Sequence, residues 1–226
     1  MQISERRPNE SGRDYAMRIL KDNIINLELE PGMAISDRDL AAQMGLSRTP
    51  VREALLDLAK VKIVEIYPQR GSVIAKIDYS LAEEAQFVRY VLEVAVVELV
   101  CSCVDDSGIQ ALEENVGLQE FYLAHPQPAK MLELDNQFHR LLFQIAGKNQ
   151  AYEMMNSLTI HFDRIRRMAV LAVKEQKWME DHRQILEAVK KGDVRLARQC
   201  MDRHLNRFHV DEAAIRQQYP QYFIDR

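Results

Sequence analysis

The chain has 226 residues, of which 47% are hydrophobic and 28% are charged, and its formal net charge is −4. This length and composition exclude a disordered or fibrous protein and leave room for one large domain or two modest ones. The longest apolar stretch, 94–104, is too short to span a membrane, and the N-terminus lacks a secretory signal, so we expect a cytoplasmic protein. The three cysteines form no Cys-x-x-Cys pair, which argues against a disulfide scaffold and a zinc ribbon.

The negative charge is unevenly distributed along the chain. Residues 1–77 contain 12 basic and 11 acidic residues, whereas residues 78–226 contain 18 and 23. Within 38–76 there are seven basic and four acidic residues. This local surplus suits contact with phosphates, so the first part of the chain is compatible with nucleic-acid binding.

Turn and capping residues predict three helices near the N-terminus. The first covers about 13–26 and ends before the turn signal Pro31-Gly32. The second begins near Ser36, whose side chain can cap free backbone N–H groups, and it ends at Gly45. Ser47 is the expected N-cap of the third helix.

Two β-prone runs, 63–67 and 72–77, then follow and predict a hairpin. Short helices followed by a basic hairpin are typical of a winged helix-turn-helix. We therefore predict such a domain over 13–77, preceded by a flexible polar arm at 1–12.

From residue 81 onward, apolar residues recur with helical spacing. Turn-forming residues divide this part into six predicted helices, one of which extends over 152–173. The predicted fold is therefore mainly α. It consists of a winged helix-turn-helix with three helices and a β-hairpin, then an all-α six-helix bundle at 81–216, and a C-terminal tail at 217–226.

The residue types in the first domain suit DNA recognition. The recognition helix of a helix-turn-helix enters the major groove with its N-terminal end toward the bases. In this chain it is the third predicted helix, and Arg48, Thr49 and Arg52 occupy its N-terminal end. The arginine fork matches two acceptors of guanine. Arg38 would lie over adjoining phosphates, and the dipeptide Arg70-Gly71 at the hairpin tip would reach the flanking backbone or minor groove. For any one arginine alone, a solvated surface charge is the alternative.

Three stretches of this domain resemble the GntR family of bacterial transcriptional regulators. They are LEPGMAISDRDLA at 29–41, LSRTPVREAL at 46–55 and QRGSV at 69–73, of which the second is very specific to the family. The resemblance implies operator contacts for the residues at the matching positions, which are Arg38, Arg48, Thr49, Arg52 and Gly71.

In the helical part, ionisable side chains share helix faces with apolar residues. Asp135 and His139 are four residues apart and so point to one side of their helix. His182 and His204 each lie on another helix, with apolar neighbours at helical spacing. One aspartate with three histidines is a plausible ligand set for a divalent metal. Taken singly, each histidine can also be a hydrogen-bonded core or surface residue.

This part resembles the FCD domain, which defines the fatty-acid-regulator-like branch of the GntR family. The resemblance rests on 89–93, on Asp135-x-x-Phe138-His139, on 181–193 and on Met201-x-x-His204. It implies that a divalent ion, such as zinc, nickel or manganese, is bound and in turn holds a carboxylate effector. The implied ligands are Asp135, His139, His182 and His204. Six helices are typical of the smaller type of this domain, which weighs against an acyl-CoA ligand.

A metal with these four ligands keeps open positions that a small organic acid can fill. Arg89 could clamp the acid with two hydrogen bonds, as its position resembles an effector-contacting one in related proteins. The alternative is an ion pair between Arg89 and Glu93 at i+4. Arg166 is a second candidate for effector binding, although a solvated surface charge is again the alternative.

Together these features predict a homodimeric transcriptional regulator without enzymatic activity. Effector binding would change the separation of the two winged domains on a palindromic, double-stranded operator. Two alternatives stay open. The helical domain can serve dimerisation only, or the protein can be a metal-dependent enzyme, for which no HExxH, nucleophile-elbow or P-loop motif is present.

Overall fold

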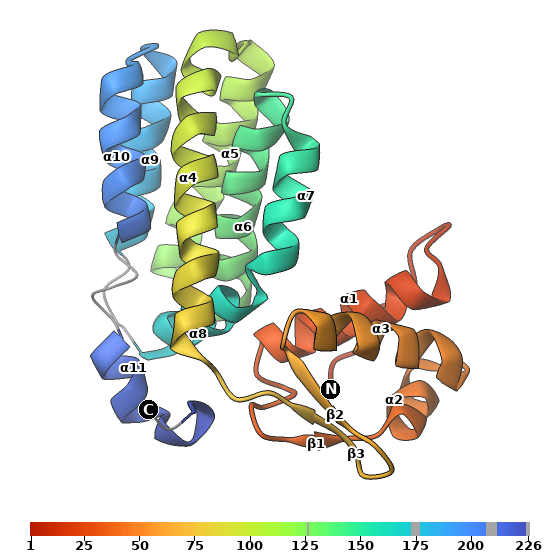
Figure 1. Cartoon of the computed structure of the whole chain (residues 1–226). Helices are drawn as coiled ribbons and strands as arrows, with labels where there is room; N and C mark the ends of the chain where they lie inside the picture. The colour runs from red at the N-terminus through yellow and green to blue at the C-terminus, as the bar shows by residue number, and fades with distance from the viewer. Residues whose placement is uncertain (126, 173–176, 207–211, 225–226) are drawn as a thin grey trace. The chain divides into compact units, whose positions relative to one another are not determined.

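The computed structural model describes all residues except 126, 173–176, 207–211 and 225–226 (Figure 1). The chain forms two compact units. The winged unit comprises residues 1–82 and 219–226, and the helical unit comprises residues 83–218. Among the described residues, no helix is both long and apolar enough to cross a membrane.

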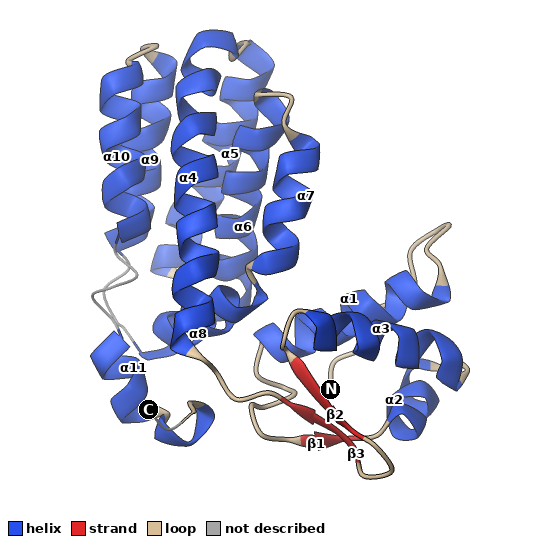
Figure 2. Ribbon diagram, viewed as in Figure 1, coloured by secondary structure: helices blue, strands red, loops and turns tan. Residues whose placement is uncertain are grey.

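Residues 1–78, all of them described, form three helices and a three-stranded antiparallel sheet (Figure 2). The elements are α1 (Gly12–Ile25), β1 (Ala34–Ile35), α2 (Asp37–Met44), α3 (Arg48–Lys60), β2 (Val64–Tyr67) and β3 (Gly71–Ile74). The strand order is β1-β3-β2. Helices α1 and α3 pack together, as do α2 and α3.

Local sequence signals explain the ends of α2 and α3. The Ser36 side chain accepts a hydrogen bond from the Asp39 N–H and so caps α2. Gly45 ends α2 in the left-handed conformation, with φ 65°, which suits a residue without Cβ. Ser47 is the N-cap of α3 but makes no side-chain capping bond. The predicted helix-turn-helix is therefore confirmed.

The predicted hairpin is present as β2 and β3, but the sequence did not predict β1. This strand has two residues, which pair as Ala34↔Val73 and Ile35↔Ser72. A pattern with a period of two residues cannot be recognised in so short a segment. Its pairing with β3 extends the hairpin to three strands.

The helical unit is an all-α bundle as predicted, but its described residues form eight helices rather than the expected six. Its described elements are α4 (Tyr79–Cys103, which begins in the winged unit), α5 (Asp106–Ala124), α6 (Pro128–Ile145), α7 (Asn149–Leu158), α8 (Ile160–Ala172), α9 (Lys177–Lys190), α10 (Val194–Asn206) and α11 (Glu212–Gln218). Helices α4, α5, α6, α9 and α10 run alongside one another (Figure 1). Their facing side chains, including Val97, Leu112, Phe138, Ile185 and Met201, form one buried apolar core.

The prediction of a single helix over 152–173 is wrong, because the described part of this segment is divided at Thr159 into α7 and α8. The Thr159 hydroxyl lies 3.4 Å from the Asn156 carbonyl oxygen and 3.2 Å from Asp163 Oδ2. Such local bonds of a threonine compete with the regular helix ladder. The short helix α11 was also not predicted as a separate element.

Both ends of the chain are bonded within the winged unit. The backbone of Gln2 exchanges two hydrogen bonds with the Asn23 side chain, at 2.6 and 2.7 Å. Near the C-terminus, the Ile77 N–H donates to the Tyr222 carbonyl at 2.8 Å, and the Ile224 N–H donates to the Ile77 carbonyl at 3.1 Å. The described residues from Tyr219 onward therefore belong to the winged unit rather than forming a free tail.

Candidate functional site

The six residues expected to contact DNA are all exposed. They lie on α2 (Arg38), on the first turns of α3 (Arg48, Thr49 and Arg52) and at the β2–β3 turn (Arg70 and Gly71). Arg48 Nη2 is 3.0 Å from each carboxylate oxygen of Asp37. Gly71 has φ 94°, and a Cβ at this position would lie 3.4 Å from the Ile35 carbonyl oxygen, so the turn favours glycine.

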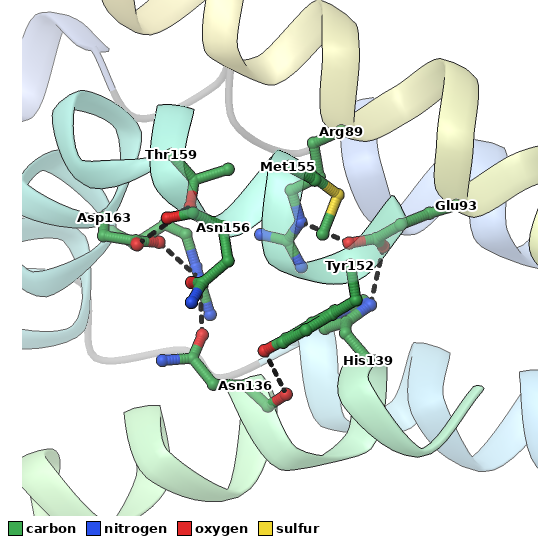
Figure 3. Close-up of a pocket in the computed structure, with 10 residues that line it drawn as sticks. Arg89, Glu93, Asn136, His139, Tyr152, Met155, Asn156, Thr159 and Asp163 are labelled. Atoms are coloured by element: carbon green, nitrogen blue, oxygen red, sulfur yellow. Dashed lines mark hydrogen bonds and ion pairs between the residues drawn. The ribbon is translucent and has the colours of Figure 1, made fainter. Parts of the chain in front are cut away.

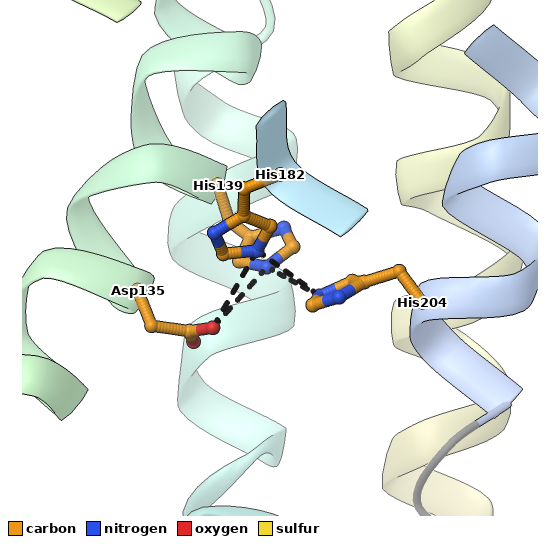
Figure 4. Close-up of side chains that lie close together, drawn as sticks. All are labelled: Asp135, His139, His182 and His204. Atoms are coloured by element: carbon orange, nitrogen blue, oxygen red, sulfur yellow. Dashed lines mark hydrogen bonds and ion pairs between the residues drawn. The ribbon is translucent and has the colours of Figure 1, made fainter. Parts of the chain in front are cut away.

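In the helical unit, the structure brings the four predicted metal ligands together at a buried centre (Figure 4). Asp135 and His139 come from α6, His182 from α9 and His204 from α10. His204 Nε2 lies 3.1 Å from His139 Nε2 and 3.3 Å from His182 Nε2. Asp135 Oδ1 lies 3.6 Å from His182 Nε2. One ligand atom of each residue is within 4.8 Å of all the others.

The other ring nitrogen of each histidine faces an oxygen atom. His139 Nδ1 is 2.6 Å from Glu93 Oε2, and His182 Nδ1 is 2.8 Å from Gln119 Oε1. His204 Nδ1 is 3.9 Å from the nearer Asp181 carboxylate oxygen. The oxygens near Nδ1 of His139 and His182 favour the tautomer that leaves the Nε2 lone pair available to a metal. At His204 the 3.9 Å separation is too long for a hydrogen bond.

The buried surroundings keep the three imidazoles neutral. Burial lowers the pKa of His182 and of His204 well below the ordinary histidine value, and the neighbouring imidazoles lower both further. Burial also lowers the pKa of His139, although Glu93 opposes this effect. The Glu93 carboxyl is itself buried, which raises its pKa, but Arg89 and His139 outweigh burial and lower this pKa to about 2.

These side chains fit a divalent cation. His139 and His182, whose Nδ1 atoms face oxygen acceptors, direct their Nε2 lone pairs at the common centre. His204 Nε2 lies within 3.3 Å of both Nε2 atoms, so a cation at this centre would have three imidazole nitrogens as neighbours. Imidazole nitrogen and carboxylate oxygen are also the donors that zinc, nickel and manganese accept.

A cavity of about 20 Å³ adjoins this centre, and His139 belongs to both (Figure 3). Arg89, Glu93, Tyr152 and Arg166 are among the side chains that line it. Burial raises the pKa of the Tyr152 hydroxyl to about 12, so this group is a neutral hydrogen-bond donor at physiological pH. The cavity has room for about one water molecule.

Both arginines predicted to bind the effector line this cavity and are paired with acids. Arg89 Nε donates to Glu93 Oε1 at 2.7 Å. This is the ion pair expected from the sequence as the alternative to effector binding by Arg89. Arg166 contacts the Asp135 carboxylate, and its Nη1 lies 2.9 Å from Asp163 Oδ1. Arg166 is therefore a mostly buried residue next to a candidate metal ligand, and not a solvated surface charge.

Sequence reasoning missed the residues that face the outer nitrogens of the histidines. Glu93 was considered only as a partner of Arg89, and Gln119 and Asp181 were not singled out. A signal was present on α5, where Asn115 and Gln119 are four residues apart on a face shared with Leu112 and so lie on its buried side. Their partner could not be identified, because α5, α6 and α9 are brought together only by folding.

Two family models match the chain. Residues 14–74 match the model for bacterial regulatory proteins of the gntR family, and residues 84–207 match the FCD domain. The HTH-type transcriptional repressor RspR of Escherichia coli (strain K12) is 30% identical over 219 residues, which cover 96% of each chain. An uncharacterised HTH-type transcriptional regulator of Streptomyces ambofaciens is 33% identical over 220 residues, or 93% of this chain and 89% of the relative.

Solved structures show the same fold. E. coli McbR/YncC aligns with a TM-score of 0.80 at 22% identity, covering 92% of this chain and 99% of that one. A putative GntR regulator from Rhodococcus sp. RHA1 aligns with a TM-score of 0.72 at 23% identity, covering 92% and 98%. The chain therefore belongs to the GntR family of bacterial regulatory proteins, with an FCD domain after its winged helix-turn-helix, and it is a DNA-binding transcriptional regulator rather than an enzyme.

Proposed function

We propose that this regulator is a cytoplasmic homodimer whose affinity for operator DNA changes when a small carboxylate binds beside a divalent metal ion. The observation that supports this most strongly is the buried meeting of three imidazole Nε2 atoms and one carboxylate, next to a cavity lined by two arginines. The ligands are Asp135, His139, His182 and His204.

Four protein ligands leave coordination positions for an effector. An octahedral ion such as nickel or manganese keeps two positions, and zinc can expand beyond four ligands. The bound ion supplies positive charge that attracts a carboxylate. His139 lies at both the ligand centre and the cavity, so an acid bound there would occupy the cavity.

The two arginines would select for an anion. Arg89 uses Nε for Glu93, so its two terminal nitrogens remain as donors that can clamp a carboxylate. Arg166 would provide a second positive charge from α8. The present cavity is smaller than a carboxylic acid of several carbon atoms, so binding must move lining side chains on α4, α7 or α8. Movement of these side chains would transmit effector binding to the helices that carry them.

An apolar stripe on α4 supports dimerisation through the helical unit. Phe87, Val91, Ala95 and Leu99 follow one another at four-residue spacing and are all exposed. Phe87 is 65% exposed. Helix α7 lines the same cavity as α4 and exposes Met154, at 58%. Exposed apolar patches of this kind are typical of protein interfaces.

Sedimentation velocity tests the dimer. The wild-type chain should sediment at twice the mass of one chain, and a Phe87→Glu/Val91→Glu variant should sediment as a monomer. Leu118→Glu, at a leucine on α5 whose exposure is similar to that of Val91, is the control and should stay dimeric. If the double variant remains a dimer, the interface does not lie at this stripe.

The effector hypothesis is tested by DNA binding. A binding sequence is first selected from random duplex DNA, and its affinity is measured by fluorescence anisotropy. Protein loaded with zinc, nickel or manganese is compared with chelator-treated protein against a panel of small carboxylic acids. We expect at least one acid to change the affinity by about 5- to 150-fold, and only with metal present.

Two variants sharpen this test. Arg166→Met should keep DNA binding and lose the response to the acid, whereas Arg195→Met, at an exposed position on α10, should keep both. If the protein binds DNA but no metal and no acid changes its affinity, the result favours the alternative in which the helical unit only dimerises.

A further inference from the structure

Helix α5 contributes no candidate metal ligand, yet two of its amide side chains are buried beside the ligand centre. Asn115 is 3% exposed and Gln119 is 1% exposed. They are four residues apart and so lie on one face of the helix. Burial of polar amides is unfavourable unless their atoms are hydrogen-bonded, so their bonds indicate what they do.

The two amides form a continuous hydrogen-bonded chain between α6 and α9. Asn115 Nδ2 donates to the Leu134 carbonyl oxygen at 3.2 Å. Gln119 Nε2 donates to Asn115 Oδ1 at 2.6 Å, and Gln119 Oε1 lies 2.8 Å from His182 Nδ1. The chain thus begins at the residue before Asp135 and ends at His182.

The chemistry of the first link fixes the direction of all the others. A backbone carbonyl oxygen can only accept, so Asn115 must present its NH₂ group to Leu134 and its oxygen to Gln119. Gln119 must then present its own NH₂ group to Asn115 and its oxygen to His182. His182 Nδ1 therefore carries the proton, and the Nε2 lone pair points toward the other ligands.

We propose that Asn115 and Gln119 are positioning residues that hold His182 in the Nδ1–H tautomer, with Nε2 ready to bind a metal. This inference rests on the metal site of the proposed function. The Phe138 ring supports the same role, since it stacks on the His182 ring at a centroid distance of 4.0 Å and an interplanar angle of 15°. Phe138 fixes the plane of the ring, and Gln119 fixes which nitrogen is protonated.

His182 differs from His139 in the charge of its partner. The acceptor for His139 is the carboxylate of Glu93, whereas the acceptor for His182 is a neutral amide. Gln119 therefore orients the imidazole without adding a negative charge to the centre. Without this acceptor, a proton on Nε2 could bond to His204 Nε2, which is 3.3 Å away, and the lone pair would be lost to the metal.

Nitrogen NMR of the histidine rings tests this directly in full-length, metal-free protein at mildly alkaline pH. Long-range ¹H–¹⁵N spectra distinguish the two neutral tautomers, and a His182→Gln variant identifies the His182 signals by their loss. We expect the Nδ1–H tautomer in the wild type and in Gln119→Glu, which loses the donor to Asn115 but keeps the acceptor for His182. Gln119→Met, of similar size without an acceptor, should populate the Nε2–H form.

Metal titration is the second measurement. Gln119→Met should bind zinc about 10- to 100-fold more weakly than the wild type, and Gln119→Glu should recover most of the loss. Val116→Ala, at a buried apolar neighbour on α5, is the control for general destabilisation. It should lower the melting temperature and leave both the tautomer and the zinc affinity unchanged.

The outcomes separate this inference from the proposed function. An Nε2–H tautomer of His182 in the wild type, or an unchanged tautomer in folded Gln119→Met, would overturn the positioning role. Should Gln119→Met fail to fold, the wild-type spectrum still decides. If the His182 tautomer changes in Gln119→Met but the protein takes up no metal, the hydrogen-bonded chain is upheld and the metal site is overturned.

Discussion

The neutral histidines of the candidate metal centre make the helical unit sensitive to acid. Burial lowers the pKa of His139, His182 and His204 in the folded state. In the unfolded chain these residues titrate near the ordinary value of about 6.5. Below that pH the unfolded state binds more protons than the folded state, so the free energy of unfolding falls as the pH is lowered. The lowered pKa of Glu93 extends this loss from about pH 4.5 down to about pH 2.

We therefore predict that chelator-treated protein loses stability between about pH 7.5 and about pH 5.5, by up to about 1.4 kcal/mol per pH unit for each buried histidine. Urea denaturation at the two pH values measures the change. His182→Gln should reduce the pH dependence, and His125→Gln, at an exposed histidine, should leave it intact. Equal stability at both pH values would refute the neutral, buried state of the cluster.

The exposed arginines of the winged unit are expected to contact different parts of the DNA, either bases or phosphates. Arg52→Ala should weaken binding to the selected sequence by about 1–3 kcal/mol and relax its specificity if Arg52 contacts a guanine. Arg38→Ala should weaken binding to all sequences alike and reduce the salt dependence. Arg195→Ala should change neither. Fluorescence anisotropy with selected and random duplexes makes the comparison, and an equal loss on both duplexes would make Arg52 a phosphate contact.

At the scale of residues, the sequence allowed the candidate ligands to be named but not their surroundings. Asp135 and His139 share a helix at i+4 spacing, and His182 and His204 each share a helix face with apolar residues. The resemblance to the FCD domain then implied these four residues as one ligand set. The contacts of Gln119 and Arg166 depend on distant residues, such as His182 and Asp135, that are adjacent only in the folded chain. No local pattern specifies such pairs.

Helices and their ends follow local conformational rules. According to these rules, replacing glycine by alanine has opposite effects on stability at Gly45 and at Gly117. Gly45 ends α2 with φ 65°, where an L-residue with a Cβ is strained. Gly117 lies inside α5, and an added Cβ would meet no atom within 4 Å. We predict that Gly45→Ala destabilises the protein by about 1 kcal/mol and that Gly117→Ala stabilises it by about 0.5–1 kcal/mol. Urea denaturation measures both, and a stabilising Gly45→Ala would contradict the left-handed cap.

Elements with strong caps or long periodic patterns were predictable, and elements decided by tertiary contacts were not. Helices α2 and α3 were recognised from Ser36, Gly45 and Ser47. At the break between α7 and α8 the Thr159 hydroxyl bonds to Asp163, and helical periodicity in the sequence continues across this position. Strand β1 exists because β3 offers it a partner.

For the whole molecule, the C-terminal segment completes the winged unit. Phe223 is 3% exposed and forms a bridge with Ile77, while the next residue, Ile224, is 42% exposed. The polypeptide therefore passes from one unit to the other twice, once after Ala82 and again at Tyr219. From the sequence, residues 217–226 were assigned to a C-terminal tail, because the pairing of this segment with Ile77 has no local signature in the sequence.

We predict that Phe223→Ala destabilises the winged unit by about 3–5 kcal/mol, the usual cost of removing a buried aromatic ring. Ile224→Ala should change its stability by less than about 0.5 kcal/mol. Hydrogen exchange followed by mass spectrometry in full-length protein reports on residues 1–82 directly. Unchanged protection in Phe223→Ala would show that the segment does not support the winged unit.

Elemental analysis of gently purified protein tests whether the histidine cluster holds a divalent metal ion. The wild type and a His182→Ala/His204→Ala variant are compared, each after dialysis against metal-free buffer. We expect about one equivalent of zinc, nickel or manganese per chain in the wild type and none in the variant. Absence of metal from the wild type, even after incubation with each ion, would contradict this expectation.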